Sequence, residues 1–370
     1  MKKSYWLFGL IFLMVAPSVF GQSAFEVKNI KTAMEKATFW QLDHPKHKDY
    51  DWTNGAFYAG VFTAYETTQN EDIFQALLDM GKRVDWRPGL RLTHADDHAI
   101  CQTYIDVARV LEEKGENTWR MMNPTRVVFE DFIEFEYVQR ERRDSITWWW
   151  CDALFMGPPA LAKYANFSDN KRFLDFNDSL FQETYDLLWD EEHHLFARDV
   201  DYLWRGTKDD KKEANGRKIF WSRGNGWVMG GLARLLEELP ADYPKRAFYE
   251  RLFKEMAVKI ASIQQEDGLW RASLLDPESY PGGETSGSGF YCYALAWGIN
   301  QGLLDKATYE PVVKKAWSSL FQNINEEGRV GWVQPIGQDP RKNFGPDSWE
   351  VYGTGAFLLA GSEMVKLIGE

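Results

Sequence analysis

The chain has 370 residues, a formal net charge of −12 at pH 7 and an aromatic content of 15%, with 17 tryptophans. The acidic balance argues against nucleic acid as a partner, because domains that bind nucleic acid present clusters of Lys and Arg to the phosphates. Tryptophan at this density must help to build the core, but it is also typical of clefts that stack on sugar rings.

Residues 1–22 have the pattern of a secretory signal peptide. Lys2 and Lys3 precede a short apolar run, and small and polar residues such as Gly21 and Gln22 follow it. The run is short for a membrane span, and no Cys stands at the expected cleavage point to carry a lipid anchor. We therefore expect an exported protein, periplasmic or secreted, without a membrane anchor.

Residues 23–370 show no linker and no low-complexity segment. Although about 350 residues exceed the usual size of a single core, we expect one catalytic domain. Cys101, Cys151 and Cys292 all lie in apolar helical contexts, and an odd number in such places indicates buried thiols rather than a disulfide framework.

Six segments share a pattern in which a polar or Gly-rich start leads into an aromatic residue and then into small and apolar residues at helical spacing. They begin near Trp52, His94, Trp150, Trp221, Glu284 and Val351. Between them lie amphipathic segments at about 25–41, 70–83, 125–139, 170–189, 245–265 and 307–323. Strand signals are limited to short stretches such as 195–199 and 330–333.

This alternation predicts an all-α protein, an (α/α)6 barrel with the apolar helices in an inner ring and the amphipathic helices outside. A helical solenoid is the alternative, but no known solenoid signature occurs within a repeat. In such a barrel the inner helices run parallel, so the polar residues at their N-termini converge on one funnel. These are Asn54, His94, Asp96, Asp97, Asp152, Trp221, Arg223, Asn225, Ser286, Ser288, Tyr352 and Thr354. Helix N-termini favour anionic ligands, so an acidic protein still has a place for a carboxylate sugar.

Asp152 follows three consecutive tryptophans, residues 148–150, and precedes an apolar run. A carboxylate between a Trp wall and a core helix is partly desolvated, which raises its pKa toward the range useful for proton transfer at neutral pH. The alternative interpretation is that Asp152 caps a helix.

The segment His94–His98 holds a second pair of carboxylates, Asp96 and Asp97. We expect one of them to face Asp152 across the funnel, although the pair also fits a capped helix start. Metal binding is the weaker interpretation, because two His at i and i+4 have no third His nearby.

The segment Trp221–Trp227 contains Arg223, Asn225 and two glycines just ahead of a strong helix. The glycines allow the backbone to approach a ligand, and Arg offers a bidentate contact to a carboxylate. A simple helix-start turn would need neither the Arg nor the paired tryptophans. The segment Gly282–Phe290 lacks the Lys and the preceding strand of a phosphate loop, so we interpret it as a sugar-facing helix start.

Five motifs, in the same order, resemble the unsaturated rhamnogalacturonyl hydrolases of glycoside hydrolase family 105 over most of the chain. They are Trp-Trp-Cys-Asp152-Ala-Leu-Phe-Met, Phe220-Trp-Ser-Arg-Gly-Asn-Gly-Trp227, Gln265-Glu-Asp-Gly-Leu-Trp270, Glu284-Thr-Ser-Gly-Ser-Gly289 and Tyr352-Gly-Thr-Gly-Ala-Phe-Leu-Leu359. The resemblance implies an (α/α)6 barrel that uses no cofactor and no catalytic metal. It also implies removal of the unsaturated uronic acid that a polysaccharide lyase leaves at a non-reducing end.

The resemblance implies that Asp152 is the general acid and base, and that the second catalytic carboxylate comes from the His94–His98 segment. Of its two carboxylates we favour Asp97, with Asp96 as the rival. The expected substrate-binding residues are Arg223, Trp221, Trp227, Asn225, His94, Asp96, Asn54, Trp149, Arg198, Ser288 and Tyr352. Many relatives carry a His where this chain has Phe196-Ala-Arg198-Asp199.

We therefore expect a hydrolase for unsaturated uronyl–rhamnose oligosaccharides from rhamnogalacturonan or from ulvan, whose rhamnose is sulfated. Arg198 would suit a sulfate and keeps ulvan among the candidates. The alternatives are a polysaccharide lyase on the same barrel and a non-catalytic glycan-binding protein.

Overall fold

The computed structural model describes residues 24–139 and 146–369. The expected signal peptide, residues 1–22, lies outside the described residues. Within the described part of the chain, no helix is long and apolar enough to cross a membrane.

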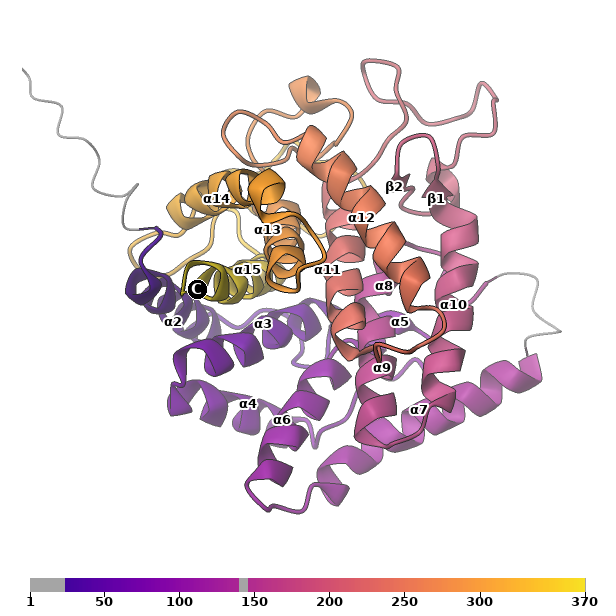
Figure 1. Cartoon of the computed structure of the whole chain (residues 1–370), viewed down its shortest axis with the longest axis vertical. Coiled ribbons are helices and arrows are strands. Elements are labelled where there is room, and N and C mark those ends of the chain that lie inside the picture. Colours follow the sequence, from indigo (N-terminus) through magenta and orange to yellow (C-terminus); the bar gives the residue numbers. More distant parts are fainter. Residues whose placement is uncertain (1–23, 140–145, 370) are drawn as a thin grey trace, which may run out of the picture.

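Six helices form an inner ring: α3 (Trp52–Thr68), α6 (Cys101–Glu113), α9 (Pro158–Phe167), α11 (Ser222–Glu238), α13 (Thr285–Asn300) and α15 (Val351–Gly369). Each packs against the next, and α15 packs against α3, so the ring closes (Figure 1). A solenoid would leave its first and last repeats apart, and the fold is therefore the expected (α/α)6 barrel.

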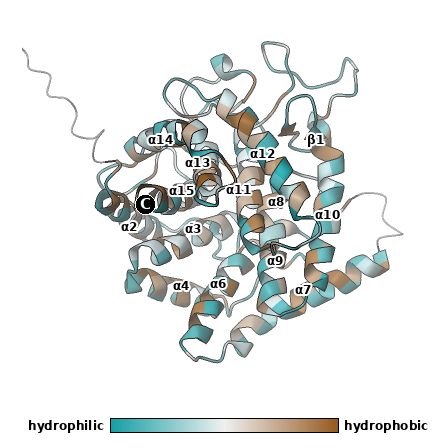
Figure 2. Cartoon of the chain, in the orientation of Figure 1, coloured by the Kyte–Doolittle hydropathy of each residue, from teal (hydrophilic) through white to brown (hydrophobic). Residues whose placement is uncertain are grey.

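Six helices lie outside the ring and alternate with the inner ones along the chain: α2 (Val27–Asp43), α4 (Glu71–Arg83), α7 (Trp119–Gln139), α10 (Arg172–Leu188), α12 (Arg246–Ser262) and α14 (Lys306–Gln322). Their hydropathy alternates along each helix, as α12 illustrates in Figure 2. In α4, for example, Ile73, Leu77 and Met80 are buried at the spacing of one helix face.

The inner helices are buried nearly all round, because other helices contact them on every side. In α13 every residue from Thr285 to Ile299 is buried. Small residues allow the helix axes to approach closely. A Cβ on Gly60 would lie 2.6 Å from the backbone oxygen of Gly355 in α15.

Two short helices, α5 (Ala95–His98) and α8 (Ala153–Met156), precede α6 and α9 at the N-terminal end of the ring. The two strands, β1 (Trp189–Asp190) and β2 (Leu195–Phe196), form one antiparallel pair. The described residues also include the 3₁₀ turns η1 (Val200–Tyr202) and η2 (Pro277–Ser279). The strand expected at 330–333 is reduced to one bridge between Ile324 and Val330. The three cysteines are buried free thiols, as expected.

Candidate active site

A pocket of about 330 Å³ lies where the N-terminal ends of the inner helices meet. It is lined by Trp52, Asp96, Trp150, Asp152, Met156, Arg198, Ile336, Gly337, Gln338 and Arg341. These residues come from the start of α3, from α5, from the start of α8, from the segment after β2 and from the segment between α14 and α15. Residues far apart in sequence are thus brought to one concave site, as the parallel inner helices predict.

Asp152 stands at the N-cap position of α8, but its side chain makes no capping hydrogen bond. The residue is only 8% exposed, and burial raises the pKa of its carboxyl group, although the nearby charge of Arg198 opposes the shift. Arg198 Nη2 lies 3.9 Å from Oδ2, and the thiol of Cys151 donates to Oδ1 over 3.3 Å. Asp152 is therefore a buried carboxyl group with a raised pKa that takes no part in capping the helix.

Asp96 is the second carboxylate of the pocket. Burial and then the charge of Asp152 raise its pKa to about 7. His94 Nδ1 lies 3.6 Å from Asp96 Oδ2, and the His94 ring packs on Trp150 with ring centroids 4.4 Å apart. Burial lowers the pKa of His94 to about 4, so its ring is neutral at pH 7. Because the two carboxylates raise each other's proton affinity, they titrate as a coupled pair.

Asp97, which we favoured from the sequence as the partner of Asp152, does not line the pocket. Its carboxylate is bound by Arg91, which does not line the pocket. The Arg91 backbone N–H donates to Oδ2 and Arg91 Nη2 donates to Oδ1, each over 2.6 Å. The other histidine of the segment, His98, packs against Phe129 and Phe132 and donates to the Leu92 carbonyl. His94 and His98 therefore have separate surroundings.

Arg223 is fully buried, and its donors point to the backbone rather than into the pocket. Nη1 donates to the carbonyl of Gln334 over 2.6 Å, and Nη2 donates to the carbonyl of Pro335 over 3.0 Å. Its guanidinium group lies between the rings of Trp221 and Tyr352, 4.5 and 4.6 Å from their centroids. The hydroxyl of Tyr352 donates to the same Gln334 carbonyl. Three expected binding residues thus hold the start of residues 334–341, which we call the wall segment.

Several other expected binding residues shape the backbone around the pocket instead of lining it. The Asn54 amide donates to the carbonyls of Lys46 and Lys48. The side chain of Asn225 bonds to the backbone N–H and carbonyl of Phe196. Ser288 Oγ accepts from the Trp270 N–H, and Trp227 is buried against Phe155 and Phe290.

Arg198 is the expected cation that does line the pocket. Its Nη1 donates to Asp199 over 2.7 Å, and its guanidinium carbon lies 5.9 Å from the ring of the half-exposed Trp149. The sequence patterns did not predict that the wall segment lines the pocket, nor that Trp52, Trp150 and Met156 do. Trp52 and Trp150 stand at segment starts that we had recognised, whereas the wall segment has no helical or strand periodicity.

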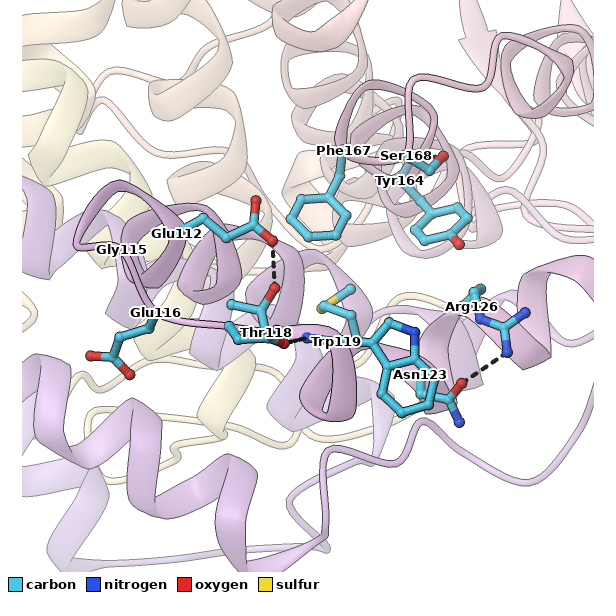
Figure 3. A pocket seen from close by; sticks show the side chains of 12 residues that line it. Glu112, Gly115, Glu116, Thr118, Trp119, Asn123, Arg126, Tyr164, Phe167 and Ser168 are labelled. Atoms are coloured by element: carbon cyan, nitrogen blue, oxygen red, sulfur yellow. Dashed lines mark hydrogen bonds between the residues drawn. The ribbon is translucent and has the colours of Figure 1, made fainter.

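Other cavities differ from this pocket. The one of about 290 Å³ also contains buried acids, among them Asp106 and Glu238, but Lys163 and Arg109 form ion pairs with both. One of about 670 Å³ is lined by residues of α6, α7 and α9, including the 65% exposed Trp119. Figure 3 shows that several of its polar side chains bond to each other, Thr118 to Glu112 and Arg126 to Asn123. The pocket around Asp152 is therefore the candidate active site.

Among the described residues, Asp190, Glu192 and His193 are close enough together to bind a metal ion. They do not line the pocket. Lys218 Nζ lies 2.7 Å from Asp190 and 3.2 Å from Glu192, so an ammonium group already balances these carboxylates.

Comparison with known proteins agrees with this geometry. The chain is 47% identical over 357 residues to an unsaturated 3S-rhamnoglycuronyl hydrolase of Formosa agariphila, and the alignment covers 94% of each protein. A protein of the same name from an Alteromonas strain is 34% identical, with 90% of this chain and 84% of that protein covered.

Among solved structures, one described as a polysaccharide lyase superimposes with a TM-score of 0.83 and 31% identity, covering 93% of this chain and 98% of that one. A glycosyl hydrolase family 88 protein of Bacteroides vulgatus follows with a TM-score of 0.81 and 29% identity, covering 92% and 99%. Residues 27–368 match the family described as Glycosyl Hydrolase Family 88. The resemblance seen in the sequence motifs is thus confirmed, and the chain belongs to Glycosyl Hydrolase Family 88.

Proposed function

We propose that this protein removes a terminal 4,5-unsaturated uronic acid from the rhamnose-linked oligosaccharides that a polysaccharide lyase releases. The observation that carries the proposal is the pair of carboxylates, Asp96 and Asp152, whose pKa values are both raised and which share one pocket with Arg198. The names of the two curated relatives support the substrate class.

The unsaturated sugar carries a C4=C5 double bond conjugated to its carboxylate, so C5 belongs to an enol ether. In the proposed reaction, Asp152 gives its proton to C4 and water adds at C5, while the ionised Asp152 takes up a proton from that water. The resulting hemiketal at C5 opens to a ketone, and the exposed C1 hemiacetal then releases the rhamnose-side hydroxyl. This route needs one carboxyl group that holds a proton at neutral pH. Ordinary glycoside hydrolysis instead uses two carboxylates that flank the glycosidic bond and proceeds by attack at C1.

Asp96 has a separate part in this scheme. The charge of Asp152 disfavours the ionised form of Asp96, so the two carboxyl groups together retain one proton up to near-neutral pH. We propose that Asp96, rather than Asp97, is the second catalytic carboxylate. Arg198, beside Asp152, is placed to pair with the carboxylate of the uronate.

Arg341 in the wall segment is half exposed and adds a second cation to the pocket lining. Two cations suit a substrate with two anionic groups, a uronate and a sulfate ester. For this reason we propose ulvan, whose rhamnose is sulfated, as the source of the substrate in preference to rhamnogalacturonan.

Two incubations followed by the ultraviolet absorbance of the conjugated double bond test the activity. The proposed hydrolase removes the absorbance from a lyase digest of ulvan and leaves intact ulvan unchanged. A lyase, the activity named for one structural neighbour, would create absorbance from the intact polymer. A glycan-binding protein would change neither sample.

Isotope labels test the chemical route. In ¹⁸O water, the hydration route labels the C5 carbonyl oxygen of the opened uronate and leaves the glycosidic oxygen on rhamnose unlabelled. In D₂O it places deuterium at C4. Label at C1 without deuterium at C4 would mean direct glycosidic attack and would refute the proposed role of Asp152.

A further inference from the structure

A buried thiol touches the carboxyl group on which the proposed reaction depends. Cys151 Sγ lies 3.3 Å from Asp152 Oδ1 and donates a hydrogen bond to it. The other two buried thiols have different partners: Cys101 Sγ lies 3.7 Å from the hydroxyl of Thr125, and Cys292 Sγ lies 3.8 Å from the carbonyl of Val313. The contact with the pocket acid therefore distinguishes Cys151 from the other cysteines.

The surrounding structure holds this thiol in place. The Cys151 backbone N–H donates to the carbonyl of Arg198 over 2.9 Å, which ties the thiol to the segment that carries the pocket cation. On the other side, a Cβ on Gly224 in the first turn of α11 would lie 3.1 Å from Sγ and 3.7 Å from Asp152 Oδ1. Because Gly224 has no side chain, the helix packs directly over the thiol and the carboxyl oxygen.

The two oxygens of Asp152 consequently have different neighbours. Oδ1 faces the thiol of Cys151, whereas Oδ2 faces Arg198 Nη2 at 3.9 Å. A protonated carboxyl group carries one hydrogen, and an oxygen that accepts a hydrogen bond from a neighbour is the poorer place for it. Arg198 Nη2, at 3.9 Å, is too far from Oδ2 to donate a hydrogen bond, so the geometry leaves the transferable proton to that oxygen.

We infer that Cys151 is a positioning residue, whose thiol occupies Oδ1 of Asp152 so that proton transfer to the substrate takes place at Oδ2. The inference rests on the proposed function, since it assigns an orientation to the acid of that reaction. Burial raises the pKa of the Cys151 thiol well above its usual value, so the thiol stays an S–H donor throughout the pH range in which the enzyme would work.

Several neighbouring groups set the proton affinity of Asp152, and Cys151 is one of them. The charged or titratable side chains that face it are Asp96, Arg198, Asp199, Arg223 and Cys151 itself. An S–H donor favours the ionised carboxylate, although the thiol is a weaker donor than a hydroxyl. Loss of the thiol thus raises the apparent pKa of the Asp96–Asp152 pair, and the alkaline limb of the pH profile moves to higher pH.

The test compares Cys151→Ala and Cys151→Ser with wild type on a lyase digest of ulvan, across pH 5 to 9. For Cys151→Ala we expect kcat to fall by about 3- to 10-fold and the alkaline limb to rise by about half a pH unit, with KM unchanged. Cys151→Ser keeps a donor and should restore both the rate and the position of the limb. Cys101→Ala is the matched control, because it removes a buried thiol that does not contact the pocket.

An unchanged kcat and pH profile in Cys151→Ala, with wild type active, would overturn the inference and leave the proposed function standing. A fall in kcat that Cys151→Ser fails to rescue would also overturn it, since packing alone would then explain the loss. If Cys151→Ala does not fold, Cys151→Val fills the space without a donor and carries the same expectation. Wild type that leaves the absorbance of the digest unchanged would overturn the proposed function and this inference together.

Discussion

At the scale of single residues, the chemistry depends on which carboxylates the fold brings into the pocket and on how closely arginines hold them. Arg91 donates hydrogen bonds to both oxygens of Asp97 over 2.6 Å, whereas the arginine nitrogens beside Asp96 and Asp152 lie 3.9 Å away and both of these carboxylates line the pocket. A carboxylate that lies outside the pocket, held by hydrogen bonds to Arg91, is not placed to transfer a proton to a substrate in the pocket. The neighbouring residues Asp96 and Asp97 are therefore expected to differ sharply in function.

Replacing the two pocket acids should stop turnover while the fold persists. We expect Asp152→Asn and Asp96→Asn each to lower kcat by about 10²–10⁴-fold, because an amide cannot donate or accept the proton. Asp97→Asn should keep kcat within about 5-fold of wild type, since removing general acid–base catalysis costs far more than removing a contact outside the pocket. Loss of absorbance from a lyase digest measures all three. A dead Asp97→Asn beside an active Asp96→Asn would reverse the assignment.

The raised pKa of Asp96 also has a consequence for stability. Its pKa is 3.8 in the unfolded chain and about 7 in the fold, so between these values the folded state binds more protons. Protonation of Asp96 stabilises the folded state at low pH, and this contribution to stability is lost as the pH rises toward 7. Asp96→Asn should therefore be more stable than wild type at pH 8, by about 4 kcal/mol, with little difference at pH 4.

Urea unfolding of wild type and Asp96→Asn at these two pH values measures the difference. Subtracting the wild-type values removes the contributions of the titrating groups that do not interact with Asp96. An Asp96→Asn variant that is no more stable than wild type at pH 8 would mean that Asp96 ionises without penalty in the pocket.

At the scale of elements, the wall segment depends on helices distant in sequence. Arg223 at the start of α11 and Tyr352 at the start of α15 donate to its first carbonyls. The Gln334 backbone N–H donates to Glu284, which also caps α13. The wall segment has no regular secondary structure, and these hydrogen bonds satisfy its backbone groups. The same segment contains Arg341, which lines the pocket.

Removing this brace should cost stability. Arg223→Met removes the hydrogen bonds to the carbonyls of Gln334 and Pro335, of which only the first keeps another donor, Tyr352. We expect a loss of about 1–3 kcal/mol in the free energy of unfolding, together with a raised KM. Arg341→Met, at a half-exposed position, should keep the stability of wild type and is the matched control. Thermal melts and kinetics report the two effects. Wild-type stability in Arg223→Met with a raised KM would instead mean that Arg223 contacts the substrate directly.

At the scale of the whole molecule, the barrel exists because its last inner helix returns to its first. Gly355 in α15 and Gly60 in α3 form the point of closest approach, and a Cβ on Gly355 would lie 2.4 Å from the carbonyl oxygen of Ala56. A backbone carbonyl cannot move aside as a flexible side chain could. The closure of the ring therefore depends on the absence of a side chain at this position.

Gly355→Ala should push α15 away from α3 and destabilise the whole barrel by about 1–3 kcal/mol or more, as overpacking of a core does. Gly345→Ala, where a Cβ meets nothing within 4 Å, should leave the melting temperature close to that of wild type. A Gly355→Ala protein as stable as Gly345→Ala would show that the two helices separate at no cost.

The sequence by itself determined the all-α class and the alternation of buried and amphipathic helices, and it singled out Asp152, which lines the pocket in the structure. These features are local, because hydrophobic periodicity and helix-start residues act within one element. The observed outer helix α4, Glu71–Arg83, for example, lies within the expected segment 70–83.

Only the tertiary structure shows that Asp96, and not Asp97, lines the pocket, because adjacent residues on a short helix point in directions about 100° apart and the packing determines which side faces the pocket. It also decided the role of Arg223, since the carbonyls that accept its hydrogen bonds lie more than a hundred residues further along the chain. The wall segment was beyond prediction for the same reason. It has no periodicity of its own, and partners on three inner helices give it its shape.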